Sequence, residues 1–159
     1  MIRKVKNSDI GRIAEIIVYN NRINYFPIFQ DIEYSFREFN VLSVAEKFRN
    51  NMDFMQHTYV YEDMVIKGFI YVMHQEVRKL YVDSFFQNQG IGRQLLQFAI
   101  REKEAQHLWA LEKNTKALRF YERYGFYQDG QKKYEEGTSI FLVHMIYAGN
   151  ERPLDAEKE

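Results

Sequence analysis

From Val77 to Arg93 the sequence runs VRKLYVDSFFQNQGIGR. Residues 77–82 predict a β-strand, and residues 90–104 follow helical spacing and predict a helix. The turn between them ends in Gly90 and Gly92, which have no Cβ to cover the backbone where the helix begins. The first N–H groups of a helix lack intrahelical acceptors, and the helix dipole favours negative charge there. The pattern therefore predicts an anion site.

Two common phosphate-binding patterns do not fit this turn. A P-loop needs a lysine after its last glycine, whereas Arg93 follows Gly92 here. The dinucleotide fingerprint needs a third glycine where Leu95 stands. The spacing is instead Gln-x-x-Gly-x-Gly over residues 87–92. Taken alone, it fits an anion site and a ligand-free strand-to-helix turn equally well.

A second segment, NTKALRFYERYGF at residues 114–126, narrows the choice. Its first residue is a good helix N-cap, and its glycine stands where a left-handed C-cap belongs. Together with the turn, this segment resembles the GNAT acetyltransferases, a family of acetyl-CoA-dependent N-acetyltransferases. The matching positions, in order, are Leu80-Tyr81-Val82, Gln87, Gly90, Gly92, Asn114, Ala117, Phe120-Tyr121 and Gly125-Phe126. Two departures are Ser84, near where the family often has proline, and a short stretch over 108–114.

The expected fold is α/β with the element order β-α-α-β-β-β-α-β-α-β-β. Strands and helices mix without strict alternation, so we expect a central mixed, mostly antiparallel sheet with helices on both faces, as the resemblance to GNAT proteins also implies. The 159 residues fit one domain, expected to span residues 1–147. The polar segment 148–159 is expected to be a flexible C-terminal tail.

The resemblance also implies where coenzyme A would bind. The backbone of residues 80–82 would pair with the pantetheine arm like an added strand, and residues 87–93 would hold the pyrophosphate. Asn114 would contact the pantetheine while also capping its helix, and Lys116 would reach the nucleotide end. The expected binding set is Leu80, Tyr81, Val82, Gln87, Asn88, Gln89, Gly90, Ile91, Gly92, Arg93, Asn114, Lys116, Ala117 and Tyr121.

Two side chains are candidates for the catalytic chemistry that the resemblance implies. Tyr121 would protonate the departing thiolate, because a phenol with a reference pKa near 10 transfers a proton usefully to a thiolate. Glu76 would take the proton from the ammonium acceptor, directly or through water, with His74 as a rival base. The alternatives are a packed helix tyrosine and a solvated acid paired with Arg78 or Lys79. No metal is needed, and the histidines show no metal-site spacing.

An aromatic segment, Tyr25-Phe26-Pro27-Ile28-Phe29 followed by Tyr34, Phe36 and Phe39, stands where the family often roofs the acceptor cleft. Such rings could hold an amine by cation–π contact, but for most of them we favour packing in the core or in a homodimer interface. The expected activity is acetyl transfer to a primary amine by direct attack in a ternary complex. The alternative is a non-catalytic acyl-CoA-binding or regulatory module on the same fold.

Composition limits the possible partners. The 22 basic and 22 acidic side chains balance, which argues against a nucleic-acid partner held by a broad basic face. No apolar run approaches the ~20 residues that span a bilayer, so no membrane partner is expected. The chain has no cysteine, which excludes thiolate chemistry and suits a reducing compartment. Without the apolar core of a signal peptide, a cytoplasmic location is expected.

Overall fold

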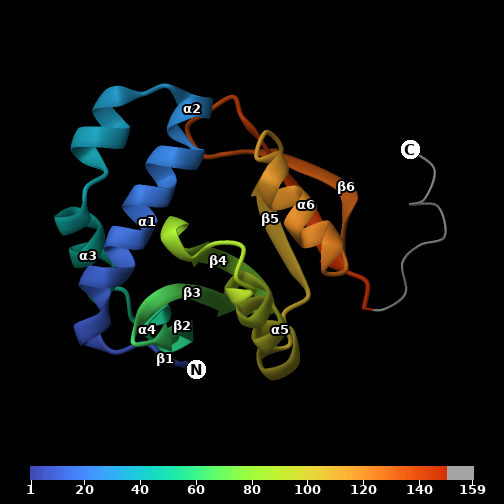
Figure 1. The fold of residues 1–159 in the computed structure, drawn as a ribbon. Coiled ribbons are helices and arrows are strands. Elements are labelled where there is room, and N and C mark those ends of the chain that lie inside the picture. The colour runs from blue at the N-terminus through green and yellow to red at the C-terminus, as the bar shows by residue number, and fades with distance from the viewer. Residues whose placement is uncertain (150–159) are drawn as a thin grey trace. The chain divides into compact units, whose positions relative to one another are not determined.

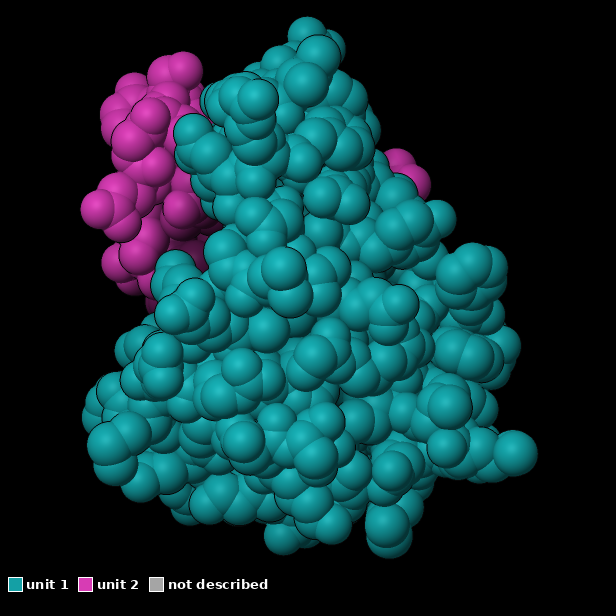
Figure 2. Space-filling model, turned by 90° about the vertical axis from the view of Figure 1, so that its left-hand side faces the viewer, with its two compact units in different colours: residues 1–104 teal, residues 105–159 magenta. Residues whose placement is uncertain are grey.

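The computed structural model describes residues 1–149 and divides into two compact units, Met1–Glu104 and a second unit that starts at Ala105 (Figures 1 and 2). The first unit contains, in order, β1 (Ile2–Lys4), a 3₁₀ turn (Asn7–Asp9), α1 (Ile10–Asn24), α2 (Phe26–Phe29), a π-helical turn (Tyr34–Glu38), α3 (Val41–Arg49), α4 (Met52–His57), β2 (Thr58–Asp63), β3 (Val65–Met73), β4 (Glu76–Val82), a 3₁₀ turn (Ser84–Phe86) and α5 (Ile91–Lys103). The second contains β5 (His107–Leu111), α6 (Thr115–Arg123), β6 (Phe126–Tyr134) and β7 (Phe141–Tyr147).

Strands β1 to β4 form the sheet of the first unit, with every neighbouring pair antiparallel. Helix α1 covers one face, because alternate side chains of β3, including Phe69, join its isoleucines in the main core cluster. Helix α5 covers the other face, where a Cβ added to Gly68 would lie 3.2 Å from Leu95 Cδ1. The expected helices on both faces of the sheet are thus present within this unit.

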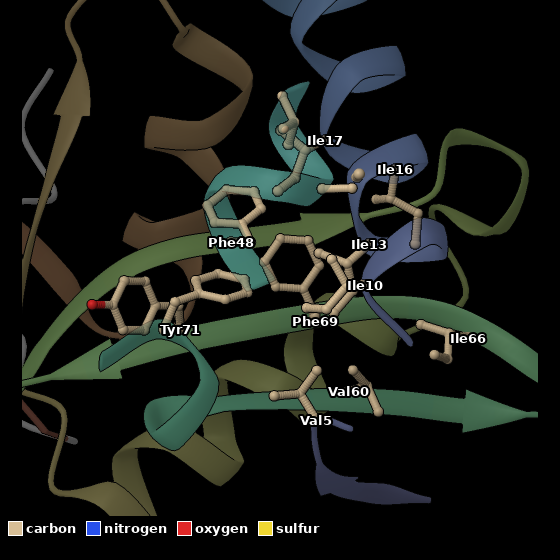
Figure 3. Packing of buried hydrophobic residues seen from close by; sticks show 14 of the residues in the cluster. Val5, Ile10, Ile13, Ile16, Ile17, Phe48, Val60, Ile66, Phe69 and Tyr71 are labelled. Carbon is tan, nitrogen blue, oxygen red and sulfur yellow. The ribbon is translucent and has the colours of Figure 1, made fainter. Parts of the chain in front are cut away.

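The core of the first unit follows from the spacing of apolar residues on α1. Ile10, Ile13, Ile16 and Ile17 are at most 2 % exposed, as their i, i+3, i+6, i+7 spacing predicts. Figure 3 shows Ile10 and Ile13 beside Phe69 of β3. The ring of Phe54 from α4 stacks on Phe48 from α3 at 4.1 Å between centroids, which ties these two helices to the same core.

The second unit is a three-stranded antiparallel sheet in the order β5-β7-β6. Its buried face carries Leu108 and Ala110 of β5 opposite Met145 and Val143 of β7. The register of β6 shifts between Gln128 and Lys132, so a bulge interrupts the pairing of β6 with β7.

The expected element order is confirmed, and the structure adds short helices at α2, at the π-helical turn and at α4. The turn between β2 and β3 lies at Met64, whose φ is +62°, directly after Asp63 at the end of β2. In the 3₁₀ turn before α1, the carboxylate of Asp9 accepts the N–H of Lys6 at 2.7 Å.

Arg3 of β1 holds the carboxylate of Asp9. Its guanidinium donates to both carboxylate oxygens of Asp9, at 2.8 and 3.1 Å, and also to Glu62. The hydrogen bond from Arg3 holds the pKa of Asp9 below its usual value, and the N–H of Lys6 acts in the same direction. These contacts connect β1 to the 3₁₀ turn that leads into α1.

The expectation of a flexible tail falls mainly on residues 150–159, which lie outside the described part of the chain. Among residues 1–149, no helix combines the length and the apolar character needed to cross a membrane.

Candidate coenzyme A site

The loop between β4 and α5 has the backbone of an anion site. Gly90 is the N-cap of α5 with φ +82°, and Gln94 donates its N–H to the Gly90 carbonyl at 3.0 Å to start the helix. A Cβ at Gly90 would meet no atom within 4 Å, so there is space for a larger side chain. Glycine is needed here because of the left-handed backbone conformation. The first turn of α5 holds no acidic residue, and Arg93 is exposed on it. An anion would therefore meet free N–H groups and a positive charge.

The residue that follows β4 anchors this loop to α1. Asp83 is 7 % exposed and forms an ion pair with Arg12 of α1. Its other carboxylate oxygen accepts the N–H of Phe85 at 2.9 Å, which starts the 3₁₀ turn before the loop. The same carboxylate thus binds Arg12 and the N–H of Phe85. The path of the chain after β4 therefore depends on Arg12, which lies 71 residues before Asp83.

The side chain of Gln87, expected in the pyrophosphate set, points into the protein. Its Nε2 donates to the carbonyl of Val82 at 3.1 Å and to Oδ1 of Asn20 at 3.3 Å. Gln87 would therefore act on a phosphate through its backbone, while its side chain holds the loop. Asn88, Gln89 and Gly90 are exposed, so this part of the loop is accessible.

The expected pantetheine-binding strand is β4. Leu80, Tyr81 and Val82 are half-buried at its carboxyl end, directly before the loop. The ring of Tyr81 stacks on Phe69 at 5.6 Å between centroids. A Cβ at Gly68 of β3 would come within 2.8 Å of the Tyr81 carbonyl oxygen, so the close approach of these two strands requires glycine at position 68.

A hollow of about 410 Å³ lies beside the loop within the first unit. Its lining residues come from α1 and from the segment after β4; they are Arg12, Glu15, Ile16, Tyr19, Asn20, Asp83, Phe85 and Phe86. The rings of Tyr19 and Phe85 lie 6° from parallel on its wall. This hollow was not expected from the sequence, because its walls come from segments more than 60 residues apart.

The second unit contributes the other half of the family pattern. Asn114 Oδ1 accepts the N–H of Ala117 at 3.2 Å, so the expected N-cap of α6 is confirmed. Gly125 has φ +96°, which confirms the expected left-handed residue after the helix. Lys116 is exposed and Ala117 is half-buried.

Tyr121 is half-buried on α6, with its ring edge-on to Phe120 at 5.3 Å and to Phe126 at 5.8 Å. Ala117, Phe120, Tyr121 and Tyr124 are each half-buried, and the buried residue of this helix is Leu118, at 9 % exposure. The tyrosine therefore packs on one side and keeps part of its surface exposed.

The base candidates lie at the start of β4. Glu76 Oε2 is 3.5 Å from Nε of Arg78, so the paired arrangement weighed from the sequence is present. His74 is exposed in the β3–β4 turn with φ +53°. Glu76 belongs to the first unit and Tyr121 to the second.

A side chain of α1 contacts the aromatic segment that was expected near an acceptor. The guanidinium of Arg22 lies 5.1 Å from the ring centroid of Phe36, and its Nε donates to the Ser35 carbonyl. Phe26 meets Phe36 edge-to-face at 5.1 Å. Glu33 pairs with Arg37, which offsets its charge. Tyr34 and Phe36 are 45 % and 49 % exposed, and no residue of α2 is buried, so these rings contact one another and Arg22 without entering the core.

Sequence reasoning missed a chain of titratable groups in the second unit. Nδ1 of His144 lies 2.7 Å from Asp129, and its Nε2 lies 3.0 Å from Nδ1 of His107. The N–H of Gln131 and the imidazole of His144 hold the pKa of Asp129 below its usual value. The pairing of β5 with β7 and the bulge in β6 create this chain, and neither is visible in the spacing of the histidines. Among residues 1–149, no group of three or more His, Cys, Asp or Glu could hold a metal ion.

Known proteins share parts of this sequence and this fold. A sequence model of the acetyltransferase (GNAT) domain matches residues 55–128, which include β4, the loop and α6. A peptidyl-lysine N-acetyltransferase, YjaB of Salmonella typhimurium, is 28 % identical over 81 residues. That alignment spans 50 % of this chain and 56 % of the relative, so the matched part is about half the length of each.

Solved structures extend the likeness to nearly the whole chain. Apo YjaB of Escherichia coli has a TM-score of 0.73 at 19 % identity, covering 94 % of this chain and 97 % of that one. The PaiA N-acetyltransferase of Thermoplasma acidophilum, solved with coenzyme A, has a TM-score of 0.66 at 20 % identity, covering 92 % and 98 %. These structures show that the chain has the fold of the GNAT acetyltransferases. The likeness in sequence to the GNAT domain covers residues 55–128, just under half of the chain.

Proposed function

We propose that the chain is an acetyl-CoA-dependent N-acetyltransferase that acetylates a primary amine, on a small molecule or on a peptide or protein, by direct attack in a ternary complex. The observation that carries the proposal is the loop from Gln87 to Arg93, with its left-handed Gly90 at the start of α5 and no acid in the first helical turn. Backbone N–H groups and Arg93 would hold the pyrophosphate there. Acetyl-CoA supplies an activated acetyl thioester.

The residues of this chain then have separate tasks. The backbone of residues 80–82 aligns the pantetheine arm, and Asn114 contacts it at the start of α6. A backbone N–H near Val82 would stabilise the negative charge that develops on the thioester oxygen. Glu76, directly or through water, takes a proton from the acceptor ammonium, so that the neutral nitrogen attacks the thioester carbon.

Tyr121 completes the transfer. As the carbon–sulfur bond breaks, the phenol donates its proton to the leaving thiolate. The nitrogen, which became positive on attack, gives its second proton to solvent, and the phenolate takes a proton back from solvent. Its partial exposure and its rigid packing between Phe120 and Phe126 suit this task. A peptide lysine is one acceptor to test, since the YjaB relative is named for peptidyl-lysine, and spermidine is another, since a structural neighbour is a spermidine N-acetyltransferase.

The test is thiol release from acetyl-CoA across a panel of lysine peptides, N-terminal peptides and polyamines. Tyr121→Phe should lower kcat by about a hundredfold, the size typical of a lost general acid, while the Kd for coenzyme A changes little. Tyr124→Phe is the matched control, because Tyr124 is half-buried on the same helix and packs on Phe120 at 5.0 Å.

Coenzyme A binding without turnover of any acceptor would favour the alternative, a non-catalytic acyl-CoA-binding module. Loss of coenzyme A affinity in Tyr121→Phe would instead make this tyrosine a structural residue.

A further inference from the structure

Asn20 is a polar residue on the buried face of α1. It is 2 % exposed and follows Ile13, Ile16 and Ile17 at helical spacing. Burial of an amide without hydrogen bonds costs free energy, so a buried asparagine at this position needs hydrogen-bond partners inside the protein. Asn20 does have them, and they lie on two further elements of the first unit.

The side chain of Asn20 forms hydrogen bonds with Ile16, Val82 and Gln87. Its Nδ2 donates to the carbonyl of Ile16, one turn earlier, at 2.9 Å, and to the carbonyl of Val82 at 3.1 Å. Its Oδ1 accepts from Nε2 of Gln87 at 3.3 Å, and the same nitrogen of Gln87 also donates to Val82. Each NH₂ group has two hydrogens, and both are used. The set joins α1 to the end of β4 and to the first residue of the loop.

The carbonyl of Val82 needs these partners because of its place in the strand. Gly68 faces Val82 in the β3–β4 register, and the next residue, Asp83, donates its N–H to the Lys67 carbonyl at 2.8 Å. In an antiparallel pair, this pattern turns the N–H and C=O of Val82 away from β3. The two amides fill both lone pairs of the Val82 carbonyl, which leaves the N–H as the group that this residue can offer to a bound molecule.

We infer that Asn20 is a positioning residue for coenzyme A: through Gln87 and the Val82 carbonyl, it fixes the backbone of the pyrophosphate loop from α1. This inference rests on the proposed function, and specifically on the binding of coenzyme A at residues 87–93. Asn20 touches no ligand. It limits the conformations of the loop before binding, so less ordering is required when the phosphates arrive.

The test is a double-mutant cycle with coenzyme A itself as the probe, measured by isothermal titration calorimetry. Asn20→Leu and Gln87→Leu should each raise the Kd for coenzyme A by about three- to tenfold, the value of one or two hydrogen bonds. Because Asn20 acts through Gln87, the double variant should bind about as weakly as either single variant. Asn24→Leu, at a half-buried position one turn later on α1, should bind like wild type.

A kinetic split separates positioning from a general loss of structure. In Asn20→Leu, the KM for acetyl-CoA should rise while the KM for the acceptor and the cooperativity of urea unfolding stay near wild type. Should Asn20→Leu fail to fold, Asn20→Asp replaces it, because Asp keeps an acceptor for Gln87 but loses both donated hydrogen bonds. Asn20→Asp should likewise raise the Kd for coenzyme A several-fold.

The outcomes are distinct. If the wild-type protein binds coenzyme A and the Asn20 variants bind it with the same Kd, this inference is wrong and the proposed function is unaffected. Fully additive effects in the double variant would also overturn it, because Asn20 would then act independently of Gln87. Absence of coenzyme A binding to the wild-type protein would overturn both.

Discussion

The loop at residues 83–93 and the segment at residues 114–125 match the same family pattern, but different kinds of contact hold them. The loop depends on partners far away in the chain: Asp83 on Arg12, 71 residues earlier, and Gln87 on Asn20, 67 residues earlier. The α6 segment is set by its neighbours, with Asn114 capping Ala117 three residues on. A motif of one family can thus be fixed by tertiary contacts in one half and by local chemistry in the other.

This difference has a consequence for mutations. Substitutions on α1 should change the conformation of the coenzyme A loop although they lie outside it. The conformation of α6 should depend mainly on substitutions within residues 114–125. The three predictions that follow test this contrast, from the largest expected effect to the smallest.

Gly90→Glu should abolish coenzyme A binding, with Kd raised more than a hundredfold. The carboxylate would place negative charge at the phosphates, and the left-handed backbone at φ +82° is strained for any residue with a Cβ. Titration calorimetry with coenzyme A measures the effect. Gly130→Glu is a matched control, because Gly130 has φ +90° and equally open space but lies in the β6 bulge. Unchanged affinity in Gly90→Glu would remove the loop from the site.

Asp83→Asn should test the tertiary half of the contrast. The amide keeps an acceptor for Phe85 but breaks the ion pair with Arg12, whose side chain is 27 % exposed. Removing one partner of a partly buried pair should lower the free energy of unfolding by about 1–3 kcal/mol, less than for a fully buried pair. Coenzyme A affinity should fall with it. Urea unfolding and calorimetry measure the two effects.

Glu15→Gln serves as the comparison for Asp83→Asn, since Glu15 also pairs with Arg12 but its side chain is 63 % exposed. It should change stability by less than about 0.5 kcal/mol. Equal effects of the two substitutions would contradict a special role for the contact between α1 and the loop.

Asn114→Ala should test the local half and give the smallest loss of stability. Removing an N-cap side chain costs about 1 kcal/mol, measured here by urea unfolding. Because Asn114 is also proposed to contact the pantetheine, the Kd for coenzyme A should rise, whereas Asn114→Ser should keep the cap and restore stability. Failure of Asn114→Ser to restore the stability lost in Asn114→Ala would contradict the view that local chemistry fixes this segment.

The same contrast explains what could be predicted from the sequence. The cap at Asn114 and the left-handed Gly125 were predicted correctly, because each depends on residues a few positions apart. The buried face of α1, Asn20 included, followed from periodicity. The partners of Asn20 did not, because no local pattern encodes a contact across 62 residues.

A second feature that the sequence did not show has the same kind of cause. The histidine chain of the second unit arises where β7 pairs with β5 and the bulge of β6 brings Asp129 to His144. Strand register, which the sequence left open, decides both the partners of His144 and the face on which they lie.

Trp109 is the only tryptophan of the protein. It lies on β5, with Nζ of Lys133 4.2 Å from its ring centroid and the ring of His144 at 4.7 Å. Its fluorescence therefore senses the surroundings of the second unit, while far-ultraviolet circular dichroism senses the backbone of both. Coincident melting curves from the two signals would mean that the units unfold as one cooperative body, and separated curves would mean that they do not. One ring thus makes the cooperativity of the two units measurable without any added label.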